Sequence, residues 1–178
     1  GLASSLSHYF ISPLHGIPRY NISIVANSEK QAKVSFLEVY DTIGAHEVLQ
    51  QMFYRTKLEI RGNDTQSVLQ FHTSNAGTKD GLRDGCVIYD EIHQYENADT
   101  VNVFSSGLGK VPNAREFFIG TDGYVREGFL DKLKERSLNV LEGKDLDDPL
   151  FPFICRIDDP KEVDDPNMWE KANPMLSE

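Results

Sequence analysis

The residue pattern with the clearest chemical potential is a short apolar run that ends in two neighbouring carboxylates, Cys86-Val87-Ile88-Tyr89-Asp90-Glu91. The apolar part is typical of a buried strand, which would carry both acids to the carboxyl edge of a sheet, where open α/β sheets bind ligands. In phosphoryl transfer such a pair divides the work. Asp90 would hold Mg²⁺, directly or through water, and Glu91 would act as general base on the attacking water. A strand that simply ends in solvent fits the same pattern.

A second strand end follows about thirty residues downstream, where the apolar run Phe117-Phe118-Ile119 leads into Gly120-Thr121. The hydroxyl of Thr121 could sense the γ-phosphate or the attacking water, although a plain strand-to-loop turn is the simpler interpretation. Ser74 and Asn75 end an earlier predicted strand and are candidate nucleotide contacts, with a turn-forming role as the alternative. We expect the tips at 89–91 and 119–121 to lie side by side where a triphosphate would bind.

Other polar residues near these strands carry weaker signals. His93 completes an Asp-Glu-Ile-His string and is interpreted as a surface histidine at a helix start. Arg115 and Arg126 flank the second strand and are interpreted as solvated arginines, with a phosphate contact as the alternative. The phosphate loop G-x-x-x-x-G-K-[ST] does not occur in these residues. Gly107-Leu108-Gly109-Lys110 has too short a spacing and does not follow a predicted strand, so it is rejected.

The elements that must position these residues alternate between strands and helices. Strands are predicted at 20–26, 56–60, 67–72, 86–89, 117–119 and 151–157, with a hairpin turn at 62–64. Helices are predicted at 1–10, 29–43, 47–54, 98–106, 126–140 and 168–172, the second of them capped by Asn27-Ser28. This alternation predicts the α/β class, with a mainly parallel sheet flanked by helices.

Composition sets limits on function. The 178 residues carry a net charge of −10, and the segment 142–165, with nine acidic and three basic side chains, contributes −6 of it. Tight nonspecific binding of DNA by these residues alone is disfavoured, because phosphate contacts need Lys and Arg. The two cysteines, Cys86 and Cys155, are predicted to be buried free thiols. No apolar run approaches the roughly 20 residues that a membrane-spanning helix needs.

Taken in order, several short strings resemble the large terminase subunit of tailed bacteriophages. Residues 86–91, continuing as Ile92-His93-Gln94-Tyr95, resemble its Walker B segment. The strings at 25–28 with 31–32, at 79–82, at 119–121 and at 169–174 resemble, respectively, the strand and helix after the phosphate loop, the Asp-Gly-Leu loop, the coupling motif and the W-x-x-A-N-P string. Each string by itself is weak evidence for the resemblance, but the strings in the same order over nearly the whole chain are much stronger evidence.

The resemblance implies a RecA-like P-loop NTPase fold that lacks its phosphate loop here, and a role in packaging viral DNA. Asp90 would bind Mg²⁺, Glu91 would be the catalytic base, and Thr121 would couple hydrolysis of ATP to motion. The implied partners are double-stranded viral DNA, the portal protein and the small terminase subunit, within a homo-oligomeric ring in the cytoplasm of the bacterial host. Residues 1–157 would be a truncated ATPase domain, and 158–178 an acidic linker with a short helix towards a nuclease domain. Such a fragment is expected to be inactive by itself.

Two other interpretations stay open from the sequence. Asp90-Glu91-Ile92-His93 matches the DExH box of helicase-like ATPases, although helicases require neither the Asp-Gly-Leu loop nor the Ala-Asn-Pro string. The acid pair could also merely end a strand in a non-catalytic interaction domain. In that case Asp90, Glu91 and Thr121 would not share a common pocket.

Overall fold

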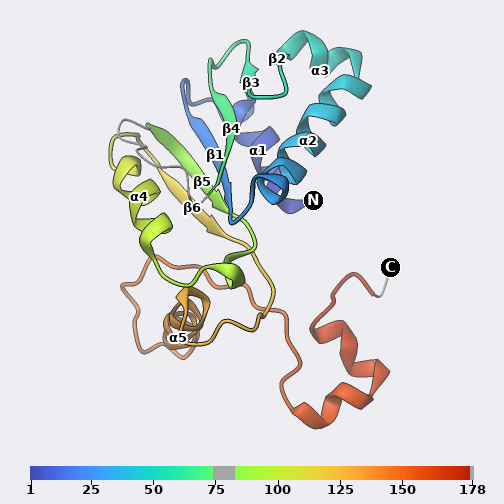
Figure 1. The fold of residues 1–178 in the computed structure, drawn as a ribbon, viewed down its shortest axis with the longest axis vertical. Helices are drawn as coiled ribbons and strands as arrows, with labels where there is room; N and C mark the ends of the chain where they lie inside the picture. Colours follow the sequence, from blue (N-terminus) through green and yellow to red (C-terminus); the bar gives the residue numbers. More distant parts are fainter. Residues whose placement is uncertain (74–82, 177–178) are drawn as a thin grey trace. The chain divides into compact units, whose positions relative to one another are not determined.

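The computed structural model describes residues 1–73 and 83–176. The chain divides into two compact units, Gly1–Lys132 and Leu133–Glu178, called the core unit and the C-terminal unit. Figure 1 colours the chain from blue at its amino end to red at its carboxyl end. The functional boundary predicted at residue 157, between an ATPase domain and its linker, is a different division and stays a prediction.

A six-stranded mixed sheet forms the centre of the core unit, with strand order β2-β3-β4-β1-β5-β6 (Figure 1). The strands are β1 (Asn21–Ala26), β2 (Phe53–Arg55), β3 (Ile60–Gly62), β4 (Val68–Thr73), β5 (Asp84–Tyr89) and β6 (Arg115–Phe118). Neighbours among β4, β1, β5 and β6 pair in parallel, whereas β2 pairs antiparallel with β3 and β3 with β4. The predicted α/β class, with a mainly parallel sheet flanked by helices, is confirmed.

Helices cover both faces of this sheet. Helices α1 (Leu2–Ile11) and α2 (Glu29–Ala45) pack on β1 and β4, and the short α3 (Glu47–Met52) follows α2. Helix α4 (Asp99–Leu108) packs on β5 from the other side (Figure 1). Helix α2 begins as predicted, because the Ser28 hydroxyl caps it by accepting the amide of Gln31. None of the described helices is both long and apolar enough to cross a membrane.

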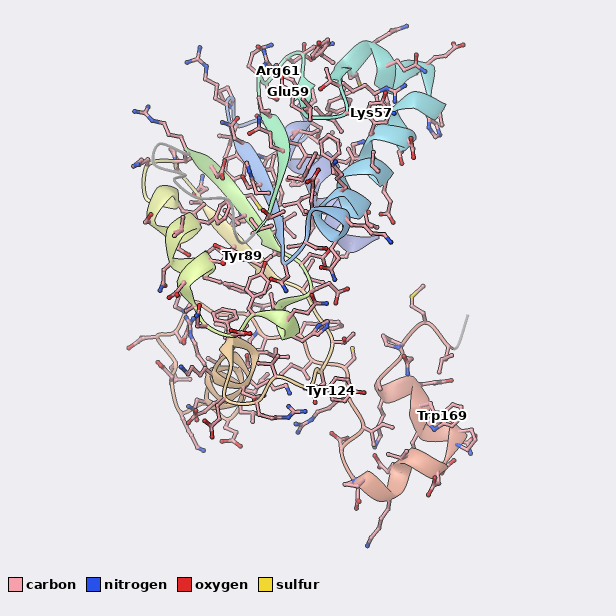
Figure 2. All side chains as sticks on the ribbon, in the orientation of Figure 1. Lys57, Glu59, Arg61, Tyr89, Tyr124 and Trp169 are labelled. Carbon is pink, nitrogen blue, oxygen red and sulfur yellow. The ribbon has the colours of Figure 1, made fainter. Side chains whose placement is uncertain are left out.

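Alternating side chains along the strands fill two separate layers of packing. Phe71 of β4 meets Phe36 of α2, with ring centroids 5.0 Å apart, on the α1 and α2 side. Tyr89 points to the opposite side, where its hydroxyl donates to the Val101 carbonyl of α4 (3.2 Å) and its ring stacks on Phe118 at 4.9 Å. Figure 2 labels Tyr89 at the end of β5. All six residues of β5 are buried, which explains its continuous apolar run.

The C-terminal unit is organised by polar contacts. Helix α5 (Phe129–Leu141) runs into it, followed by two 3₁₀ segments, η2 (Pro160–Asp164) and η3 (Pro166–Lys171). Arg136 and Asp148 form a two-pronged ion pair, with Nε and Nη2 each 2.6 Å from a carboxylate oxygen. Among the described residues of this unit, no hydrophobic side chain is buried. Trp169, labelled in Figure 2, donates from its ring nitrogen to the Val163 carbonyl (2.8 Å) and is 44% exposed.

The strand predicted at 151–157 is wrong. The segment has no regular secondary structure, and Phe151 and Phe153 are 87% and 80% exposed. Pro152 removes an amide that a ladder would need, and none of the described strands pairs with this segment. Cys155 within it is a partly exposed free thiol, whereas Cys86 in β5 is free and buried as predicted.

Candidate functional site

The ends of β5 and β6 meet at one edge of the sheet. The strands pair in parallel, with Tyr89 opposite Phe118. Beyond the last paired residues, the Ile119 amide donates to the Tyr89 carbonyl (2.9 Å), and the Ile92 amide donates to the Ile119 carbonyl (3.1 Å). The acid turn, residues 90–95, is therefore bonded directly to the β6 loop, residues 119–123. The expectation that the two tips lie side by side is confirmed.

Asp90 is the best anchored residue of the acid turn. Its amide donates to the Val25 carbonyl at the end of β1 (2.8 Å), which extends the β1–β5 ladder by one bond. One carboxylate oxygen accepts the Glu91 amide (3.0 Å), and the other lies 3.4 Å from the Ser35 hydroxyl of α2. The side chain of this half-buried acid is thus held between the turn and the helix that follows β1.

Glu91 occupies a backbone conformation that non-glycine residues rarely adopt. Its φ of 54° and ψ of 43° lie in the left-handed region, which costs a residue with a side chain on the order of 1 kcal/mol. The conformation starts the 3₁₀ turn η1 (Ile92–Gln94), in which the Gln94 amide donates to the Glu91 carbonyl (3.0 Å). The Glu91 side chain is 41% exposed, so it lies at the surface of this edge rather than in the core.

His93 is placed differently from the surface histidine that the sequence suggested. Its side chain is only 18% exposed, and its Nδ1 lies 3.3 Å from a Glu91 carboxylate oxygen. The two groups are in contact but do not form a hydrogen bond, and Nδ1 has no hydrogen-bond partner among the described residues. A Cβ on Gly123 would lie 2.9 Å from the His93 Cβ, so the β6 loop packs on this ring where only glycine fits.

The other predicted site residues are less closely joined to the acid pair. Thr121 is exposed in the β6 loop, two residues beyond Ile119, whose carbonyl accepts the Ile92 amide. Ser74 and Asn75 lie outside the described residues. Arg115 begins β6 at the opposite edge, where it bonds to the Tyr20 hydroxyl (3.3 Å), which removes it as a phosphate contact of this edge.

The string Gly107-Leu108-Gly109-Lys110 ends a helix instead of opening one. Gly107 and Leu108 are the last residues of α4, and Gly109 is its C-cap. A phosphate-binding loop precedes a helix, because the amides at a helix amino end face the anion. The rejection of this string as a phosphate loop is confirmed.

Comparison with known proteins gives this arrangement a family. Residues 4–138 match the model of the terminase large subunit, ATPase domain. The match covers more than half of the chain.

This chain belongs to the terminase large subunit ATPase family.

The chain is also similar to two named proteins, one of which is a terminase large subunit. The terminase large subunit of Lactococcus phage p2 is 24% identical over 158 residues, which are 86% of this chain and 29% of that protein. Protein YmfN of Escherichia coli strain K12 is 30% identical over 97 residues, which are 54% of this chain and 21% of that protein. The chain thus spans less than a third of the length of either relative.

The fold agrees as well. The crystal structure of the HK97 bacteriophage large terminase superposes with a TM-score of 0.82, at 18% identity, covering 98% of this chain and 36% of that one. At this identity the likeness concerns the fold alone. The family assignment separates the terminase interpretation from the helicase-like one that the Asp-Glu-Ile-His string left open.

Proposed function

We propose that this chain supplies the ATP-hydrolysing edge of a phage DNA-packaging motor, as part of a longer large terminase subunit. The observation that carries the proposal is the bonding of the acid turn to the β6 loop at the carboxyl edge of a parallel sheet. Ligands of open α/β sheets bind at that edge. The adjacency of the two tips supports this proposal over the non-catalytic interpretation, in which Asp90, Glu91 and Thr121 would not share a common pocket.

Asp90 is proposed to hold Mg²⁺. No group of three His, Cys, Asp or Glu side chains suited to a metal is found among the described residues. That fits Mg²⁺ in phosphoryl transfer, which keeps several waters and takes one or two carboxylates together with the phosphates of the substrate. The ion would neutralise charge on the phosphates. Asp90 is fixed by hydrogen bonds to the Val25 carbonyl and the Glu91 amide and lies near the Ser35 hydroxyl. Its carboxylate would therefore already be oriented when Mg²⁺ binds.

Glu91 is proposed to activate water, and Thr121 to pass on the state of the nucleotide. A carboxylate that is partly exposed can accept a proton from a water placed in line with the γ-phosphate. Thr121 lies in the loop bonded to the same turn, so a shift at Glu91 would reach it through the Ile92 to Ile119 bond. Ser74 and Asn75 remain proposed nucleotide contacts.

The role of the whole subunit is proposed from the family. Its substrates would be ATP with Mg²⁺ and double-stranded viral DNA, and its partners the portal protein and the small terminase subunit. It would act as a homo-oligomeric ring in the cytoplasm of the bacterial host, with a nuclease domain outside these residues. The 178 residues contain no G-x-x-x-x-G-K-[ST] loop, so we expect them to hydrolyse ATP poorly by themselves.

Glu91→Gln in the terminase subunit tests the proposal. We expect kcat for ATP to fall by about 10²-fold or more, because the amide cannot accept the proton, while the Kd for nucleotide stays unchanged. The matched control is Glu127→Gln, which alters another exposed glutamate with a positive φ, 57°, outside the acid turn. It should leave kcat intact. Undiminished turnover in Glu91→Gln would remove Glu91 as the base.

A further inference from the structure

Tyr95 closes the acid turn by a long-range hydrogen bond. Its side chain is buried, with 5% of the residue exposed, and its hydroxyl donates to the Val25 carbonyl at 3.1 Å. The same carbonyl accepts the Asp90 amide at 2.8 Å. One backbone oxygen at the end of β1 thus fastens both the first and the last residue of the turn.

The Tyr95 hydroxyl is a dependable donor. Burial, with a smaller contribution from the charge of Asp90, raises the pKa of Tyr95 above its ordinary value. The hydroxyl therefore keeps its proton at every physiological pH. A buried hydrogen bond of this kind makes a modest net contribution to stability, and an acceptor left without its donor costs more. The Val25 carbonyl would still keep its Asp90 bond, so loss of the hydroxyl would loosen one end of the turn only.

The residue between these two attachments is the one with the unfavourable backbone. Glu91 holds a left-handed conformation that its own side chain disfavours. It keeps that conformation because both ends of the turn are fixed and because Gln94 donates back to its carbonyl. Release of the Tyr95 end would allow Glu91 to relax towards ordinary φ values, which would swing its carboxylate away from the edge.

Tyr95 also joins the turn to the start of α5. Its carbonyl accepts the Phe129 amide (3.3 Å), and the two rings lie 6.4 Å apart. Those contacts use the backbone and the ring, so replacement by phenylalanine would leave them in place. The effect of the hydroxyl can therefore be isolated from the packing of the residue.

We propose that Tyr95 is a positioning residue for hydrolysis: its hydroxyl, bound to the Val25 carbonyl, holds the acid turn in the conformation that presents Glu91. This rests on the proposed function of Glu91 and adds a residue that does not itself touch substrate. Loss of the Tyr95 hydroxyl would slow the hydrolysis of ATP, the step in which Glu91 is proposed to act, and would have little effect on the binding of nucleotide.

The kinetic test is Tyr95→Phe in the terminase subunit. We expect kcat for ATP to fall about three- to tenfold, with KM for ATP within about twofold of the parent. The matched control is Tyr20→Phe, because Tyr20 is also buried and its hydroxyl donates to a backbone carbonyl, that of Asn113, at 2.7 Å on the opposite edge. It should keep its kcat and lose at least as much stability, because its hydroxyl also accepts a hydrogen bond from Arg115. An equal kcat in both variants would overturn the proposal.

A second test does not depend on catalysis. In the 178-residue chain, amide hydrogen exchange of Ile92 and Gln94 should accelerate at least threefold in Tyr95→Phe and stay unchanged in Tyr20→Phe. Unchanged exchange at both amides would overturn the positioning role, even with slower turnover. If Glu91→Gln leaves turnover intact while Tyr95→Phe accelerates exchange, the assignment of Glu91 as base fails and the hold of Tyr95 on the turn stands.

Discussion

Two apolar segments with similar sequence patterns adopt different structures in this chain. Residues 86–89 form the buried centre of β5, whereas residues 151–157, equally apolar at their start, form no strand and expose Phe151 and Phe153. Strand β5 lies between β1 and β6, so its backbone groups are paired on both sides. The comparison teaches that an apolar run becomes a strand only where neighbours pair its backbone and cover its side chains.

The largest expected effect is a difference between identical substitutions in the two units. Phe36→Ala, at a fully buried position of α2, should lower the free energy of unfolding by about 3–5 kcal/mol, because it leaves a cavity in the core unit. Phe153→Ala, at a position 80% exposed, should change it by less than about 0.5 kcal/mol. Denaturant unfolding measures both. Similar losses would mean that the C-terminal unit has a core of its own in solution.

A smaller effect is expected from acid, which should loosen the C-terminal unit before the core unit. The hydrogen bonds from Arg136, and then the Leu150 amide, hold the pKa of Asp148 below its ordinary value. A lowered folded pKa gives stability that is complete above the unfolded pKa of about 4 and is lost as pH falls through the folded value. Lys171 lowers the pKa of Glu162 in the same direction.

Amide protection factors of residues 133–150, which take account of the slower intrinsic exchange in acid, measure that loosening when followed from pH 7 to below pH 4. Asp148→Asn should already exchange faster at pH 7 and respond less to acid, since the titrating partner of Arg136 is gone. High salt should act in the same direction as acid. If acid and salt leave the protection factors of the parent chain unchanged, the ion pairs are not what organises this unit.

The smallest expected effect distinguishes two reasons why residues 151–157 form no strand, namely the proline at 152 and the lack of a neighbouring strand. Pro152→Val restores a backbone amide and a strand-favouring residue, but it supplies no neighbouring strand. We therefore expect unchanged far-UV circular dichroism and no new amide protection at 151–157. Protection that appears in this variant would show that the proline, rather than the want of a partner, keeps the segment irregular.

The sequence predicted the parts of the fold that depend on local pattern. Strands β1 and β5 are buried on both faces, so their runs are mostly apolar, and Ser28 marks the start of α2 by its capping chemistry. Strand β2 was missed because its three residues continue a helical pattern and are fixed only by pairing with β3. Helix α5 starts at Phe129 rather than Arg126, because Glu127 takes a left-handed conformation just before it.

The candidate site was predictable only as far as strand order allows. The adjacency of the tips followed from two consecutive parallel strands, and the geometry bears it out. The place of His93 was not predictable, because its burial depends on the close approach of Gly123 in a distant loop. Tyr95 was visible only as part of the Walker B-like string, and its hydrogen bond was not predictable, since its partner is a backbone carbonyl seventy residues away that any residue type could supply.

The left-handed backbone at Glu91 has a consequence for how this protein can be improved. Glycine or asparagine would sit more comfortably there, so a library selected only for heat resistance should drift away from glutamate at this position. With Glu91 as the proposed catalytic base, such survivors would unfold at higher temperatures and hydrolyse no ATP. A carboxylate at a strained backbone position is therefore consistent with the role proposed for Glu91.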